Sequence, residues 1–279
     1  MITAENIFDN FKSTMSGLEK GLQVIHITTP ASQLRCCQDE EEIEVVLVRS
    51  DLKPFDQIPV KQQETIIGLL KRRECPEEAK GVARDYMQPL GERILVSADT
   101  PLLTFIENQE SLDRIVISGT KIYGLVTRSD FLKLPVSLLG FALVTHIEAL
   151  MLNMIRETGI SEETWLEWLE PKPRRRNEIE SRYADLSRQR SDPDQLELTY
   201  FSDKRNILEH LIALEKYTPY LPDKSLIRKL AEIKKLRNAI AHTGNNADND
   251  DNLQKFIDRL RDAHKWIDNM EQWQALNWL

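Results

Sequence analysis

The residues best suited to chemistry stand together in segment 236–242, which reads Leu-Arg-Asn-Ala-Ile-Ala-His. Apolar residues recur every three or four positions through this segment, which predicts that it ends a helix. Asn238 and His242 are four residues apart and share one face, while Arg237 lies about 100° away around the axis. Gly244 follows as a capping residue, so His242 falls in the last turn, where the helix dipole favours imidazolium. An arginine, an amide and a histidine that titrates near neutral pH suit proton transfer beside a phosphate.

The predicted helix before His242 is basic, although the chain as a whole is acidic. The 279 residues carry 37 Lys and Arg against 45 Asp and Glu, a net charge of -8. Residues 224–237 hold six basic side chains and one acid, Glu232, a local net of +5. The overall balance argues against a uniformly basic nucleic-acid coat but allows a local basic edge. We therefore expect Arg228, Lys234 and Lys235 to contact RNA phosphates.

This motif and the helical periodicity of residues 136–279 resemble HEPN domains, which are all-α bundles that usually dimerise and often cleave RNA without metal. The family motif is Arg, four to six residues, then His, often with Asn directly after the Arg. It is intact here as Arg237-Asn238 and His242. The resemblance implies that Arg237 stabilises a charged phosphorane, Asn238 orients the substrate, and His242 transfers a proton at the ribose 2′-hydroxyl. It also implies a homodimer acting on RNA and allows for a neutralising partner protein, as in toxin–antitoxin or defence systems.

Other interpretations of these residues stay open at this point. A basic helix that ends in His-x-Gly can be simply a well-capped helix with a cationic last turn. Some HEPN domains are non-catalytic and bind nucleotides or partner proteins. Arg205-Asn206 and His210 mimic the motif, but no helix-ending glycine follows, so we interpret them as a decoy. The basic segment 172–176 could contact RNA phosphate, but solvation is the favoured interpretation.

The first 135 residues alternate short apolar runs with turn residues, which predicts a mixture of strands and short helices. Two of the predicted strands flank the turn 118–120 and are expected to form a hairpin. The expected strands are residues 45–48, 65–70, 114–117 and 121–126, and the expected helix is 102–106. We place the domain boundary near Pro135, a residue type suited to the first turn of a long helix.

A pattern occurs twice in this half, at 66–74 and 122–131: an apolar strand, a glycine, two aliphatic residues and a polar tetrad that ends in an acid. Similar lead-ins, at 28–30 and 98–101, precede the two copies. With these lead-ins the first copy is expected to be longer by about 14 residues.

The second copy, Gly-Leu-Val-Thr-Arg-Ser-Asp at 124–130, resembles the closing motif of CBS domains. Tandem CBS pairs form a pseudo-twofold module that commonly binds adenosine nucleotides. The resemblance implies that Asp130 accepts the ribose hydroxyls and Thr127 approaches a phosphate. In the first copy Lys71 replaces the hydroxyl residue and would meet a phosphate, while Glu74 replaces the aspartate. Thr-x-x-Asp is also a capping-box-like start for a helix, which needs no ligand.

Taken together, the sequence predicts an α+β protein with a tandem CBS module over 1–135 and an all-α HEPN-like domain over 136–279. The repeats are expected at about 20–78 and 86–135. The three cysteines form neither a disulfide framework nor a zinc spacing, and no metal or cofactor is expected for the chemistry. The apolar stretch 136–152 is too short for a span and is expected to be a buried helix, and with no visible signal peptide a cytoplasmic protein is the default. The predicted function is a nucleotide-regulated, metal-independent endoribonuclease, with ATP, ADP or AMP as regulatory ligand. The alternative is a non-catalytic dimeric module that binds nucleotides or partners.

Overall fold

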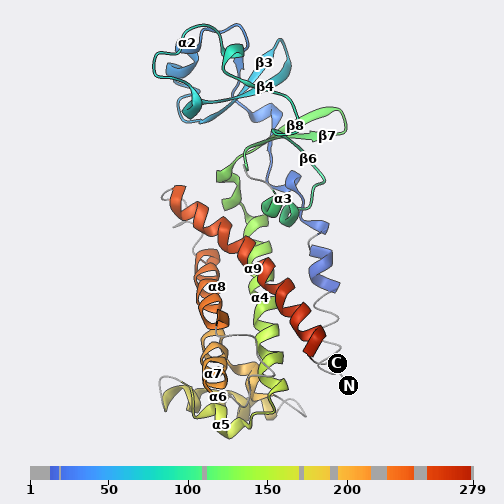
Figure 1. Cartoon of the computed structure of the whole chain (residues 1–279), viewed down its shortest axis with the longest axis vertical. Helices are drawn as coiled ribbons and strands as arrows, with labels where there is room; N and C mark the ends of the chain where they lie inside the picture. Colours follow the sequence, from blue (N-terminus) through green and yellow to red (C-terminus); the bar gives the residue numbers. More distant parts are fainter. Residues whose placement is uncertain are drawn as a thin grey trace. The chain divides into compact units, whose positions relative to one another are not determined.

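The computed structural model describes residues 13–18, 20–108, 112–169, 173–188, 194–214, 225–241 and 250–277. It contains two compact units, Thr14–Leu139 and Gly140–Leu279, called the tandem-repeat unit and the helical unit below. The division falls within helix α4 (Leu134–Glu157), which begins next to Pro135. The chain is therefore a mixed α/β unit followed by a helical one (Figure 1).

The tandem-repeat unit contains two four-stranded sheets, one for each copy of the repeat, with orders β2-β3-β4-β5 and β1-β8-β7-β6. In each sheet a parallel pair, β2 with β3 or β6 with β7, is extended by an antiparallel hairpin, β3-β4 or β7-β8. The strands are β1 (Thr29–Pro30), β2 (Cys37–Gln38), β3 (Gln57–Gln62), β4 (Thr65–Lys71), β5 (Gln88–Pro89), β6 (Leu95–Ser97), β7 (Arg114–Ser118) and β8 (Lys121–Val126). An edge strand of each sheet comes from the segment that precedes the other copy, because β1, which precedes the first copy, pairs with β8, and β5, which precedes the second, pairs with β4.

Equivalent backbone pairings confirm the internal repeat. The isolated bridge between Gln23 and Pro101 has its counterpart in the bridge between Val82 and Glu42. Val82 follows Gln23 by the same number of residues as Pro101 follows Glu42. This pairing corrects the predicted lead-ins, because it makes 98–101 equivalent to 39–42 rather than to 28–30. The two copies are consequently similar in length, and the predicted extra segment in the first copy is wrong. The predicted lead-ins were matched because both contain a Thr-Pro pair. Thr29-Pro30 forms edge strand β1, whereas Thr100-Pro101 directly precedes helix α3.

The glycine of the motif is required at the point where each edge strand crosses. Gly124 pairs with Pro30 and Gly68 pairs with Pro89. A Cβ atom on Gly124 would overlap the carbonyl oxygen of Thr29, and one on Gly68 would lie 2.6 Å from the carbonyl oxygen of Gln88. The glycine of the motif is therefore explained by a close backbone approach in both copies, independently of any ligand.

Most of the predicted elements of this unit are confirmed, with two errors. Residues 65–70, 114–117 and 121–126 are strands, and α3 (Leu102–Asn108) is the expected helix. Residues 45–48 are not a strand but belong to helix α2 (Ile43–Val48), whose Ile43 and Val46 are buried while Val48 is exposed. Strand β3 was not predicted, because Pro59 interrupts its apolar run.

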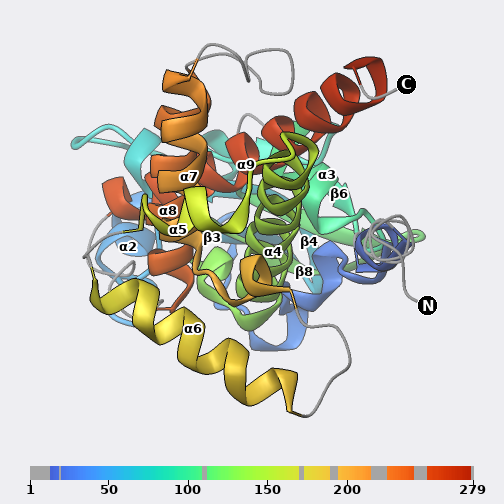
Figure 2. The same cartoon turned by 90° about the horizontal axis from the view of Figure 1, so that it is seen from below.

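The helical unit consists of the remainder of α4 with α5 (Glu162–Leu166), α6 (Arg174–Ser187), α7 (Phe201–Ala213), α8 (Ser225–Ala241) and α9 (Asp250–Asn277). Gly140 lets three helices approach closely, because a Cβ atom there would lie 2.9 Å from Ile240 of α8 and 3.0 Å from Leu260 of α9. Figure 1 shows α9 crossing α4 and α8, and Figure 2 shows α6 at the outer edge of the unit. By length and composition α4 could cross a membrane, but 61% of its most apolar window is buried within the protein. Packing in the core accounts for this composition.

Candidate functional site

The predicted catalytic motif lies at the C-terminal end of α8. Arg237 and Asn238 are exposed, whereas Leu236 is fully buried and Ile240 packs toward Gly140. Among the described residues, the side chains of Arg237 and Asn238 form no ion pair and no hydrogen bond. His242 and Gly244 lie outside the described residues. The helix periodicity thus positions the first two residues of the motif on an accessible surface.

The other basic residues of α8 differ in their surroundings. Lys234 and Lys235 are exposed, and Lys235 forms an ion pair with Glu232. Glu232 is also bound by Arg259 of α9, with 3.3 Å between the guanidinium Nε and a carboxylate oxygen. Hydrogen bonds from these two cations lower the pKa of the Glu232 carboxyl below its usual value. Arg228 stands apart from this group, because it lines a groove between α8 and α9.

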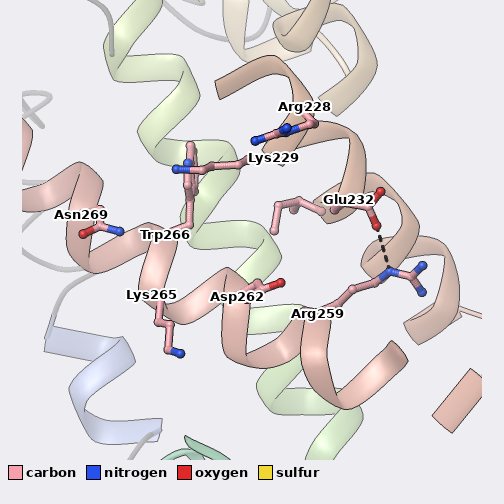
Figure 3. A pocket seen from close by; sticks show the side chains of 9 residues that line it. Arg228, Lys229, Glu232, Arg259, Asp262, Lys265, Trp266 and Asn269 are labelled. Atoms are coloured by element: carbon pink, nitrogen blue, oxygen red, sulfur yellow. Dashed lines mark hydrogen bonds and ion pairs between the residues drawn. The ribbon is translucent and has the colours of Figure 1, made fainter. Parts of the chain in front are cut away.

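The groove between α8 and α9 (hereafter the α8–α9 groove) encloses a cavity of about 360 Å³. Its walls combine charged side chains with the buried Ile233 and Trp266, and Figure 3 shows Trp266 among the charged side chains. The lining residues are Arg228, Lys229, Glu232 and Ile233 of α8, and Arg259, Asp262, Lys265, Trp266 and Asn269 of α9. The sequence interpretation missed the α9 contribution, although 259, 262, 266 and 269 recur at helical spacing and could have indicated one face.

In the tandem-repeat unit, Asp130 is buried and bound within its own repeat. One carboxylate oxygen accepts hydrogen bonds from the Thr127 backbone N–H at 2.7 Å and the Thr127 hydroxyl at 3.0 Å. The other oxygen forms an ion pair with Lys133 at 2.6 Å and accepts a bond from the Thr29 hydroxyl at 3.4 Å. The arrangement is the capping box that the sequence also allowed, at the start of the short 3-10 turn Arg128–Leu132.

The equivalent position of the first repeat is more open. Lys71 pairs with Glu74 at 3.0 Å, and the Gln88 side chain donates to the other Glu74 oxygen at 3.3 Å. The Glu74 side chain is 57% exposed, whereas that of Asp130 is 8% exposed. Replacement of the aspartate by glutamate therefore leaves a solvated ion pair where the second repeat has a buried cap.

Asp113 connects the two repeats and was not predicted as a site residue. Its carboxylate accepts a hydrogen bond from the Gln57 side chain at 2.9 Å, across the boundary between repeats, and another from the Arg128 backbone N–H at 3.2 Å. Burial raises the pKa of Asp113, while the charge of Lys71 acts in the opposite direction. Asp113 therefore joins Gln57 of the first repeat to the turn after Thr127 in the second. A lone acid before a strand carries no sequence signal for such a contact.

A cavity of this unit lies elsewhere. It measures about 590 Å³ and is formed near the closed ends of the two hairpins, with Lys61 and Lys121 among apolar residues such as Ile66 and Ile122. Thr127, Asp130 and Lys71 do not line it.

Buried ion pairs stabilise the outer part of the helical unit. Arg175 of α6 binds Asp203 of α7 through two nitrogens, at 2.8 and 2.6 Å, and both side chains are almost fully buried. Lys204, also buried, binds Glu148 at 3.0 Å. The expectation that segment 172–176 is solvated is therefore wrong for Arg175, because Asp203, distant in sequence, neutralises it. His210, the histidine of the decoy motif, stacks on Trp168 with ring centroids 5.1 Å apart.

Comparisons with known proteins give no family for the chain. No protein-family model matches it, and no curated protein matches it. Solved structures that it resembles include CBS domains. One is that of a bacterial CNNM/CorC family Mg²⁺ transporter in complex with ATP, with 21% identity over 44% of this chain and 92% of that one, and a TM-score of 0.35. Others are CBSX2 from Arabidopsis thaliana (18%, covering 39% and 89%, TM-score 0.33) and a transcriptional regulator from Streptococcus pneumoniae (16%, covering 39% and 95%, TM-score 0.33). Similarity of this extent assigns no ligand or activity to the chain.

Proposed function

We propose that the chain is a nucleotide-regulated ribonuclease, in which the helical unit cuts RNA and the tandem-repeat unit binds an adenine nucleotide. The observation that carries the proposal is the exposure of Arg237 and Asn238 at the end of α8, without partners among the described side chains. By contrast, Arg175 and Arg156 of the same unit are bound by carboxylates. An arginine and an amide left exposed five and four residues before a histidine are available to a substrate.

The proposed reaction is attack by the ribose 2′-oxygen on the adjacent phosphorus, with cleavage of the bond to the 5′-oxygen. One proton leaves the 2′-hydroxyl and another reaches the 5′-oxygen, and His242 takes part in this transfer. Arg237 stabilises the negative charge of the phosphorane through its planar guanidinium, and Asn238 orients the phosphate by hydrogen bonds. In a homodimer, two motifs would face one cleft and supply both proton-transfer groups. Arg228, Lys234 and Lys235 would hold the RNA backbone through its phosphates.

Nucleotide binding is proposed for the tandem-repeat unit because it carries the CBS-type motif within a twofold-repeated fold. The ribose hydroxyls of a nucleotide would have to replace Thr29 and Lys133 at the outer oxygen of Asp130. Lys133 would then be free to meet a phosphate, as would Lys71 in the first repeat. The ligand would thus exchange one set of partners of Asp130 for another and shift the balance between two arrangements of the turn.

A second candidate is a non-catalytic dimeric module that binds nucleotides or partner proteins. The occupied capping box favours it, since Thr127 and Asp130 fulfil a structural role without any ligand.

RNA digestion separates the two candidates. The full chain is incubated with a mixed RNA pool in EDTA, beside the variants His242→Ala and His210→Ala. We expect fragments that end in 2′,3′-cyclic phosphate from the wild-type chain and from His210→Ala, and none from His242→Ala. Because His210 belongs to the decoy motif and is an exposed histidine of the same unit, it controls for general effects of losing an imidazole. Equal activity in His242→Ala would refute the catalytic assignment.

A further inference from the structure

The α8–α9 groove has the size and the polarity of a ligand site. Its volume of about 360 Å³ lies within the range of roughly 300–1,000 Å³ of small-molecule pockets. Ile233 and Trp266 are 3% and 4% exposed, so they form an apolar floor rather than a protruding surface. A flat aromatic ring is the kind of group that such a floor accommodates.

The charges around the floor are unevenly compensated. Glu232 is bound by Lys235 and Arg259, which neutralise it within the protein. Arg228 and Lys229, in contrast, are exposed and have no ion pair among the described residues. Two uncompensated cations on adjacent positions of α8 make this side of the groove an anion site, and phosphate is the anion that such a pair favours.

Polar groups from α9 complete the recognition of a nucleotide. Figure 3 shows Arg228, Lys229 and Asn269 around Trp266, with Asp262 one turn away on α9. The Asn269 amide can both donate to and accept from a base edge. Asp262 is exposed in the groove, and its carboxylate is an acceptor for ribose hydroxyls.

We propose that the α8–α9 groove binds one nucleoside monophosphate unit of single-stranded RNA. Arg228 and Lys229 hold the phosphate, Asp262 accepts from the 2′-hydroxyl, and the base lies over Ile233 and Trp266. The inference rests on the proposed function in taking RNA as the source of the nucleotide. Arg237 follows Lys229 by eight residues on the same helix, or about 12 Å along its axis. A nucleotide held in the groove would therefore place a neighbouring unit of the strand near the motif.

Titration of the full chain carrying His242→Ala tests this inference, because binding is then measured without cleavage. The probes are a single-stranded RNA of about ten nucleotides, DNA of the same sequence and 5′-AMP. The groove variants Arg228→Gln and Lys229→Gln are compared with Lys255→Gln, which removes one exposed charge from α9 outside the groove. We expect each groove variant to weaken RNA binding roughly tenfold and to reduce the slope of log K against log salt by about 0.7, as for one lost phosphate contact. Asp262→Asn should reduce the preference for RNA over DNA.

Each outcome decides the inference. If the groove variants bind RNA with the affinity and salt dependence of Lys255→Gln, or if none of the probes binds, the inference is wrong. If only 5′-AMP binding depends on Arg228 and Lys229, the nucleotide site stands and a free nucleotide is its source. If the groove variants weaken RNA binding but the wild-type chain never cleaves RNA, the groove stands and the catalytic assignment fails.

Discussion

Replacement of Asp113 by asparagine is expected to stabilise the tandem-repeat unit at neutral pH. The carboxylate is 9% exposed and burial raises its pKa, so the folded chain bears a cost for the ionised form. The Gln57 side chain donates to Asp113 through its nitrogen, while its amide oxygen is buried without a hydrogen-bond partner. In Asp113→Asn the Gln57 amide must turn over to accept from the new NH₂ group, which gives its oxygen a partner but moves its nitrogen to the position without one and away from Asp56. The bond to the Arg128 N–H can be kept by the asparagine oxygen.

Because the turned amide gains no hydrogen bond on balance, the expected stabilisation comes from removal of the buried charge, about 1.4 kcal/mol for each tenfold difference in proton affinity between the folded and the unfolded chain. The pH dependence has a defined sign. Because the folded-state pKa of Asp113 is raised above the usual value of 3.8, folded protein holds its proton at pH values where the unfolded chain has lost it. The stability of the wild-type chain relative to Asp113→Asn therefore falls as pH rises from about that value through the raised pKa, and is constant above it.

Urea unfolding of both proteins across this pH range measures the difference directly. We expect the advantage of Asp113→Asn to be largest at neutral pH and to shrink toward zero in acid. An asparagine variant that is less stable at neutral pH, or an advantage that does not change with pH, would refute the reasoning. Gln57→Leu removes a hydrogen-bond donor to the Asp113 carboxylate, so the advantage of Asp113→Asn should be larger in that background.

Two further substitutions test the buried carboxylates. Asp130→Ala removes the helix cap and the ion pair, so we expect a loss of about 2 kcal/mol in the free energy of unfolding. The matched change Glu74→Ala, at the exposed position of the first repeat, should cost about 0.5 kcal/mol or less. Equal losses in urea unfolding would contradict the structural role of the cap. Asp203→Ala leaves the Arg175 guanidinium buried without its bidentate partner, for an expected loss of about 3–5 kcal/mol. Glu178 also pairs with Arg175, but the Glu178 side chain is 41% exposed, so Glu178→Ala should cost under about 1 kcal/mol. If thermal unfolding gives Glu178→Ala a loss as large as that of Asp203→Ala, burial does not determine the strength of these pairs.

The fold was predictable where local pattern and packing agree. The hairpin of the second repeat and the helices α3, α4 and α8 follow directly from periodicity. Helix α2 was missed because four aliphatic residues in sequence fit a buried strand and a short helix equally well. Edge strands β1 and β5 are two residues long and owe their existence to partners in the other repeat, so no local signal identifies them.

The candidate site divides in the same way. The exposure of Arg237 and Asn238 follows from the spacing of the buried residues of α8. The α8–α9 groove and the Asp113 contact join residues far apart in the sequence, which periodicity cannot bring together. The sequence predicted two alternative roles for Asp130, because the same Thr-x-x-Asp pattern can cap a helix or bind a ribose. The structure shows Asp130 in the capping role.

The exchanged edge strands give a physical reason for two copies of the repeat in one chain. A chain with one repeat would carry its own lead-in strand but would have nothing to pair along the outer edge of its hairpin, and unpaired edges invite association. Two such chains would satisfy each other reciprocally, each strand completing the neighbouring sheet, which is the isologous contact of a symmetric dimer. The present unit has the arrangement of that dimer with its two subunits joined in one polypeptide. Two copies joined in one polypeptide need not be identical, and here one has a buried aspartate at the motif while the other has Lys71 and Glu74.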